Sequence, residues 1–191
     1  MNNIRKLLIV ALTGFALSAC AQQMGSPQPS MSTLDAVRSS DIPAMRVGTF
    51  APAPTLPASK DKSIGSRAVT LEPPGGSLAK YLGNALENDL RMGGKLDPKA
   101  DLVLEGLLTA SDLDTGMDTG KGNLGAKFSL KRDGKSIFEK DLSVQAQWDS
   151  SFVGAVAIPE AINQYTALYD KLATALFTDS DFKAAVKVAP K

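Results

Sequence analysis

The sequence predicts an α+β domain: a mainly antiparallel sheet of four to five strands with two helices on one face. Three observations support this. Apolar residues recur at spacings of three and four near residues 77–92 and again near 159–178, polar and apolar residues alternate around residues 126–148, and an Asp-Gly pair interrupts that alternation. The expected order is strand, an optional second strand, helix, three strands, helix.

The first half of this order ends in a well-marked helix. Residues 42–50 are expected to form a strand, ended by a proline-rich segment whose prolines cannot donate ladder hydrogen bonds, and residues 64–71 a second strand. Ser77 suits a helix N-cap because its hydroxyl can accept from first-turn amides. The apolar stripe that follows predicts a helix, which Gly93-Gly94 ends.

Three antiparallel strands and a second helix are expected in the second half. Strand-forming residues fill 100–109, and alternation resumes on both sides of Asp133-Gly134, a pair suited to a tight hairpin turn. The strand after this turn has one solvent-exposed face. The last helix is expected to begin near Pro159, which suits a first helical turn, and to end near Thr178, followed by a short helical turn.

The N-terminus has the pattern of an export signal. Arg5 and Lys6 precede an apolar run over residues 7–17, which is shorter than the about 20 apolar residues that a membrane-spanning helix needs. We expect residues 1–19 to be cleaved as a signal peptide and residues 20–41 to form a flexible tether. The alternative, a partly ordered arm, is suggested by the apolar residues within 34–37. Residues 42–191 are then expected to form a single periplasmic domain.

Leu17-Ser18-Ala19-Cys20 resembles the lipobox of bacterial lipoproteins, in which an aliphatic residue and two small residues precede the lipidated cysteine. The resemblance implies that Cys20 is acylated and becomes the new N-terminus, and Cys20 is also the only cysteine in the chain. By the same resemblance, Ala21 in place of aspartate implies lipid anchoring on the periplasmic face of the outer membrane rather than at the inner membrane.

Composition excludes several classes of function. The chain has no histidine, which removes Ser-His-Asp and Cys-His catalysis and histidine zinc ligation. Without residues 1–19 it carries 19 basic and 20 acidic residues, a balance that offers no electrostatic reason to bind nucleic acid. Asp112, Asp114 and Asp118 fail the spacing of a calcium loop, since glycine and methionine stand at the next required positions. We therefore expect no enzyme activity, no cofactor and no bound metal.

Residues 148–159 have an unusual pattern. Trp148 and the polar residues 149–151 are followed by apolar residues and glycine up to Pro159. One interpretation is a recognition loop with Trp148 and Phe152 as aromatic anchors. The other is that these residues pass under the last helix and fill the core.

The expected topology of residues 42–178 is similar to that of the LPS-assembly lipoproteins and of the auxiliary lipoproteins of ABC-type and lipid-transport systems. This resemblance implies a membrane-anchored, non-catalytic accessory, assembly or binding module with an envelope protein as partner. The alternative is a carrier that holds a small apolar or lipid ligand in a cavity between helices and sheet.

Overall fold

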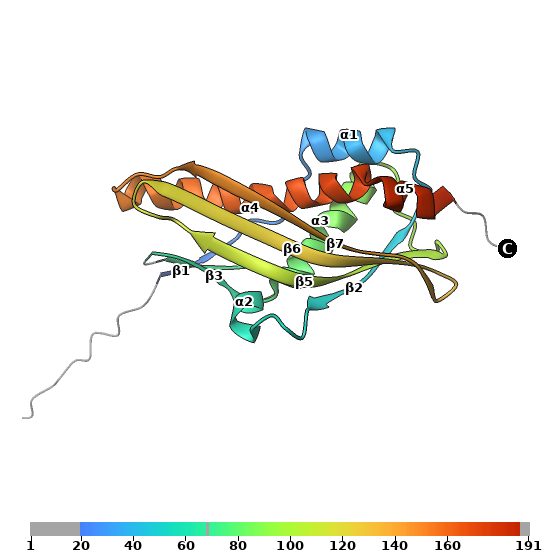
Figure 1. Ribbon diagram of the computed structural model, residues 1–191, viewed down its shortest axis with the longest axis horizontal. Helices are drawn as coiled ribbons and strands as arrows, with labels where there is room; N and C mark the ends of the chain where they lie inside the picture. Colours follow the sequence, from blue (N-terminus) through green and yellow to red (C-terminus); the bar gives the residue numbers. More distant parts are fainter. Residues whose placement is uncertain (1–19, 68, 188–191) are drawn as a thin grey trace, which may run out of the picture.

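The computed structural model describes residues 20–67 and 69–187, which form two mixed sheets and five helices with the loops between them (Figure 1). The expected signal peptide, residues 1–19, lies outside the described residues. In chain order the elements are β1 (Cys20–Gln23), α1 (Met31–Ser39), β2 (Arg46–Pro52), α2 (Ala58–Lys62), β3 (Ile64–Ser66), β4 (Val69–Glu72), α3 (Leu78–Met92), β5 (Leu102–Asp114), β6 (Thr119–Arg132), β7 (Lys135–Asp149), α4 (Gly154–Thr178) and α5 (Ser180–Lys187).

The larger sheet has the strand order β2-β5-β6-β7. The three antiparallel strands predicted after the first helix are β5, β6 and β7, and Asp133 and Gly134 make the β6–β7 turn with φ of 50° and 77°. β2 pairs in parallel with β5, which requires a crossover connection that here includes α3. β2 lies at the sheet edge, where Pro52 is tolerated.

α3 and α4 cover one face of this sheet, and α4 runs along the long axis of the molecule (Figure 1). The side chains between helices and sheet are buried and form one cluster, with Phe128 of β6 against Phe50 of β2 and Leu172 of α4 near its centre. The prediction of an α+β fold with helices on one sheet face is therefore confirmed for these two helices.

The start of α3 is capped as the sequence predicted, with a second contribution from α2. The amide of Lys80 donates to the Ser77 hydroxyl over 3.2 Å. The buried carboxylate of Asp61 accepts from the Ser77 hydroxyl and from the amide of Ala79, over 3.1 and 2.9 Å. An acceptor on these first-turn amides satisfies donors that the helix itself leaves free.

A second sheet was not predicted. Residues 64–71, expected as one strand, form the hairpin β3–β4, which turns at Arg67 with a φ of 54°. β1 pairs in parallel with β4, so the small sheet has the order β1-β4-β3. The expectation of a single sheet is therefore wrong, although the larger sheet is mainly antiparallel, with β2 pairing in parallel with β5. The second sheet depends on the pairing of β1 with the distant β4, which leaves no local pattern.

The flexible tether expected over residues 20–41 is replaced by β1 and α1. Ser30 caps α1, its hydroxyl accepting from the amide of Thr33, and Leu34 and Val37 are buried. α1 lies on the outer side of α3 and α4 as a third layer (Figure 1). The alternative of an ordered arm is therefore the correct one, because these few apolar side chains suffice to dock a helix on two others.

The last helix begins five residues earlier than expected. α4 starts at Gly154, so Pro159 lies inside the helix instead of at its first turn. A proline there removes the amide that would bond to the carbonyl four residues earlier. The apolar stretch before Pro159 is consequently helical and does not pass beneath the helix as a core segment.

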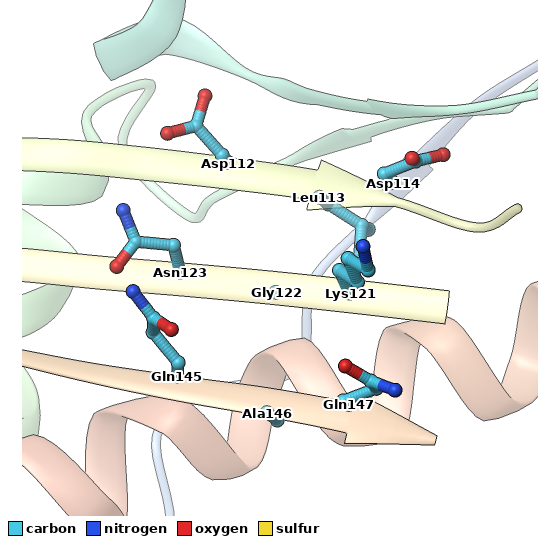
Figure 2. Close-up of a pocket in the computed structure, with 9 residues that line it drawn as sticks. All are labelled: Asp112, Leu113, Asp114, Lys121, Gly122, Asn123, Gln145, Ala146 and Gln147. Atoms are coloured by element: carbon cyan, nitrogen blue, oxygen red, sulfur yellow. The ribbon is translucent and has the colours of Figure 1, made fainter. Parts of the chain in front are cut away.

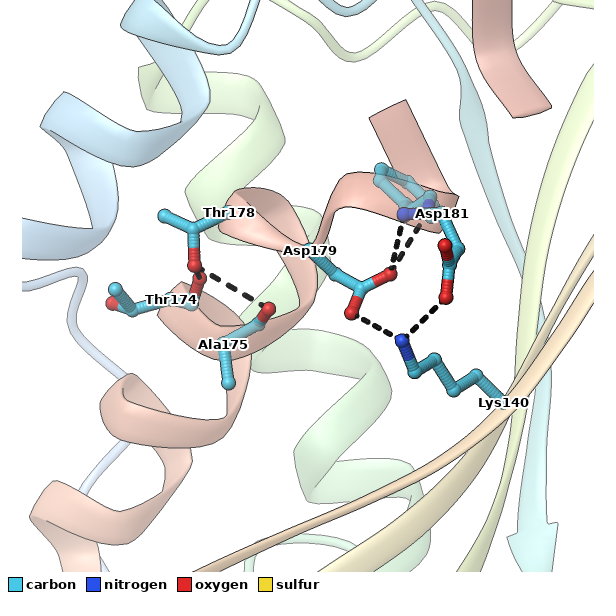
Figure 3. A network of polar contacts seen from close by, with 7 residues as sticks. Lys140, Thr174, Ala175, Thr178, Asp179 and Asp181 are labelled. Carbon is cyan, nitrogen blue, oxygen red and sulfur yellow. Dashed lines mark hydrogen bonds and ion pairs between the residues drawn. The ribbon is translucent and has the colours of Figure 1, made fainter. Parts of the chain in front are cut away.

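The junction between α4 and α5 is held by a charged network (Figure 3). Lys140 of β7 donates to the carboxylates of Asp179 and Asp181, each over 2.7 Å. The other Asp179 oxygen accepts from the amides of Asp181 and Phe182 over 3.0 Å, which caps α5. Burial acts to raise the pKa of Asp179, but the hydrogen bonds from Lys140 and from these amides outweigh it and hold the pKa below its ordinary value.

Replacing Asp179 by alanine is expected to lower the free energy of unfolding by about 1 kcal/mol, since the α5 cap is lost. Urea denaturation of residues 20–191 carrying Cys20→Ser measures the change. Asp181→Ala is the matched control, because exposed Asp181 contributes only an ion pair to Lys140 and should change stability by less than about 0.5 kcal/mol. Equal losses in both variants would contradict a capping role for Asp179.

Candidate functional site

The residues singled out in the sequence lie at one end of the molecule but in different environments. Cys20 begins β1, where its backbone pairs with Val69 of β4. Trp148 is near the end of β7 and is 9% exposed, whereas Phe152 precedes α4 and is 74% exposed. Each interpretation of residues 148–159 therefore holds for one of the two aromatic residues. Trp148 is a core residue, and Phe152 is exposed.

Trp148 is buried because the facing strand has no side chain opposite it. Trp148 pairs directly with Gly120 of β6. A Cβ atom placed on Gly120 would lie 2.2 Å from Cε2 of the indole, so only glycine leaves room for the ring. The indole Nε1 is buried, and within the described part of the chain it has no hydrogen-bond partner.

Exposed apolar side chains lie next to Phe152 in the chain and in the β5–β6 turn, which is hydrogen-bonded to the same loop. We call this group the apolar end; it consists of Met117, Phe152, Val153 and Val156. The β5–β6 turn and the loop before α4 are joined by a hydrogen bond from the amide of Ser150 to the carbonyl of Asp118, 2.7 Å long. An exposed cluster of large apolar groups is a common mark of an interaction surface.

A second candidate surface lies on the sheet face opposite the helices. Six polar side chains stand there in two rows across β5, β6 and β7, and they line a hollow of roughly 580 Å³ (Figure 2). We call it the polar hollow. One row is Asp112, Asn123 and Gln145, and the other is Asp114, Lys121 and Gln147. Sequence reasoning predicted a solvent-exposed face for β7 but not this alignment, which depends on strand register.

Some groups of the polar hollow have partners and some do not. Lys60 of α2 forms an ion pair with Asp112 at one margin, and Asp114 accepts from the amide of Gly116 over 2.9 Å. The Oδ1 atom of Asn123 is buried and accepts no hydrogen bond from the described residues. A buried acceptor without a donor is costly, and a ligand donor at this position would satisfy it.

The chemistry of the polar hollow suits a polar ligand without large net charge. Two carboxylates, one ammonium and three amides provide both donors and acceptors. No group of three or more carboxylate or cysteine side chains that could hold a metal ion is found among residues 20–67 and 69–187. Asp114 and Asp118 lie on either side of the hairpin connection between β5 and β6.

Three tyrosines form a polar group inside the core that the sequence did not indicate. The hydroxyl of Tyr165 hydrogen-bonds to that of Ser111 over 2.8 Å and to that of Tyr169 over 3.1 Å. Burial, followed by the charge of Asp170, raises the pKa of Tyr81 to about 12, and burial raises the pKa of the other two phenols. These phenols therefore remain protonated at neutral pH, in which state they serve as hydrogen-bonding core residues.

The carrier alternative required an apolar cavity between helices and sheet. In the described part of the chain this space is filled by fully buried side chains, among them Leu82, Leu86, Leu168 and Phe128. The polar hollow and a smaller hollow of roughly 290 Å³ near Lys127 and Glu139 both lie on the opposite face of the sheet. The described residues therefore do not provide the apolar cavity that the carrier interpretation requires.

Comparison with known proteins defines the class of fold. No protein-family model and no curated protein sequence matches the chain. A protein from Xanthomonas campestris in the family DUF330 superposes with a TM-score of 0.58 at 12% identity, covering 86% of this chain and 96% of that one. This chain therefore shares the fold of that protein.

A minor lipoprotein from Acinetobacter baumannii superposes more loosely, with a TM-score of 0.40 at 16% identity over 73% of this chain and 90% of that one. Across residues 20–67 and 69–187, no helix combines the length and the apolar character needed to cross a membrane.

Proposed function

We propose that this chain is a lipid-anchored envelope lipoprotein that acts as a non-catalytic binding or assembly module. Its partner is an envelope protein, and the polar hollow binds a polar segment of that partner. The observation that carries the proposal is the pair of polar rows across β5, β6 and β7, with the unsatisfied Oδ1 atom of Asn123 among them.

The anchor is supported by the sequence around Cys20, which joins a positive start, a short apolar run, small residues and the only cysteine of the chain. Anchoring at the periplasmic face of the outer membrane follows from Ala21 by resemblance. A non-catalytic role agrees with the lack of histidine and with the protonated state of the buried tyrosines.

A protein partner agrees with the shape and chemistry of the polar hollow. Its floor is a sheet surface, and its side chains supply both donors and acceptors from three strands. Amide and carboxylate groups in such an arrangement hydrogen-bond to the backbone of an extended peptide or to its polar side chains.

Site-directed photocrosslinking in the native host tests the proposal. A photoreactive residue in place of Gln147, which is exposed in the polar hollow, is expected to form a discrete adduct with one envelope protein. Adding Lys121→Glu should reduce the adduct about tenfold, because it replaces an ammonium group that lines the hollow by a carboxylate.

The matched control is the same photoreactive residue in place of Asn163, which is exposed on α4 and lies away from the hollow. Its adducts should be weak and unaffected by Lys121→Glu. Equal yields and the same products from both positions would contradict binding through the polar hollow.

A further inference from the structure

The apolar end is exposed although its members are large hydrophobic residues. Met117 is 60%, Phe152 74%, Val153 56% and Val156 60% exposed. Between Ser150 and Pro159 the sequence has no charged residue. Asp149 and Glu160 border this segment in the sequence, and Arg67 donates to the carbonyls of Ser151 and Phe152. Among the described residues at the apolar end, acidic side chains therefore accompany a single arginine and not a basic cluster.

Arg67 holds the apolar end in place. Its guanidinium donates to the carbonyl of Gly116 over 2.5 Å, to that of Ser151 over 2.8 Å and to that of Phe152 over 3.1 Å. These bonds connect the β3–β4 turn to the β5–β6 turn and to the loop before α4. The exposed apolar groups are therefore presented on a fixed scaffold, and little conformational entropy is lost when they bind.

The lipidation site lies at the same end. Cys20 pairs with Val69, which is two residues beyond Arg67, and β1 is parallel to β4. In Figure 1, β1, the β3–β4 hairpin and the start of α4 all lie at the left end of the long axis. Acyl chains on Cys20 would consequently enter a bilayer next to Phe152 and its neighbours.

We propose that the apolar end inserts into the lipid bilayer beside the acylated Cys20 and fixes the orientation of the domain on the membrane. This inference rests on the lipid anchor of the proposed function. The anchor keeps the apolar end at the bilayer surface, so a modest apolar area suffices for insertion. Because basic side chains are scarce there, the interaction is with the apolar interior of the bilayer and not with anionic headgroups.

Insertion also has a consequence for the polar hollow. Its second row, Asp114, Lys121 and Gln147, lies near the strand ends that lead to the apolar end. With the apolar end in the bilayer, the polar hollow faces the aqueous phase close to the headgroups. A partner bound there would itself be a membrane protein or another anchored protein.

Spin labels on the acylated mature protein, residues 20–191, in phosphatidylcholine vesicles test the insertion. Cys20 is the only native cysteine and is blocked by acylation, so Phe152→Cys and Val156→Cys each create a single labelling site. Labels at both positions are expected to be more accessible to oxygen than to a water-soluble nickel complex, at depths of about 5–10 Å below the headgroups. Lys135→Cys, at the exposed start of β7 next to the β6–β7 turn, is the matched control and should remain accessible to the nickel complex.

Three other outcomes would each overturn the insertion. Failure of the protein to float with the vesicles would overturn the anchor and, with it, the insertion. Flotation with nickel accessibility at positions 152 and 156 equal to that at 135 would leave the anchor intact and overturn the insertion. Dipolar broadening between labels without bilayer depth would show that a second copy of the chain covers the apolar end, which also overturns it.

Discussion

At pH 8, replacing Asp89 by asparagine is expected to raise the free energy of unfolding by about 2–4 kcal/mol. Asp89 lies on α3 and is 2% exposed. Burial, followed by the negative charge of Asp170 on α4, raises the pKa of Asp89 from the ordinary 3.8 to about 7. Ionising Asp89 in the folded protein is therefore costly, and asparagine avoids that cost.

The effect depends on pH in a defined direction. The folded state retains the Asp89 proton up to about pH 7, whereas the unfolded chain loses it near pH 4, so the wild-type protein loses stability as pH rises through this window. Above pH 7 the difference stays constant. Urea denaturation at pH 4, 5.5, 7 and 8 should show the gain from Asp89→Asn appearing only as the pH increases.

Asp35→Asn on the exposed side of α1 is the control for this prediction. It removes one carboxylate from an exposed position, so it should not reproduce the gain in stability that Asp89→Asn gives at pH 8. A constant difference between Asp89→Asn and wild type from pH 4 to pH 8 would show that Asp89 does not titrate as proposed.

Replacing Gly120 by alanine is expected to lower the free energy of unfolding by about 2–3 kcal/mol. The new methyl group would lie 2.2 Å from Cε2 and 2.4 Å from Nε1 of Trp148. An indole ring is rigid, so either the ring or the strand must move. Because Trp148 is the only tryptophan, its fluorescence emission should shift towards longer wavelength as the indole becomes exposed.

Gly122→Ala provides the comparison on the same strand and the same sheet face. Its Cβ would meet the Cδ1 atom of Leu168 at 3.0 Å, the flexible end of a side chain that can rotate away. We expect a loss below about 1 kcal/mol and an unchanged emission maximum. A similar loss in both variants would contradict a specific steric role for Gly120.

The polar hollow could be predicted from the sequence only in part. Alternation in β7 correctly predicted that Gln145 and Gln147 face solvent, because side chains alternate between the two faces of a strand. Their alignment with Asn123 and Asp112 could not be predicted. It depends on the β5–β6 register, which shifts at an irregularity between Leu108 and Ala110.

The exposure of Phe152 could not be predicted from the sequence, for a different reason. A run of apolar residues without helical or strand periodicity does not indicate which of them face the core. Trp148 and Phe152 are four residues apart, yet one is buried against Gly120 and the other is exposed. Trp148 belongs to the β7 ladder opposite Gly120, whereas Phe152 lies in the loop between the end of β7 and the start of α4 at Gly154.

The sequence by itself determined the elements that depend on neighbours within a few residues: the Asp133-Gly134 turn, the capped helix after Ser77 and the apolar face of the last helix. Its prediction that Cys20 is acylated likewise rests on adjacent residues. Only the tertiary structure decided the parallel pairing of β1 with β4 and the position of Cys20 beside the apolar end. These arrangements join residues more than forty positions apart, and they form only when sheets and helices pack together, since no local interaction encodes them.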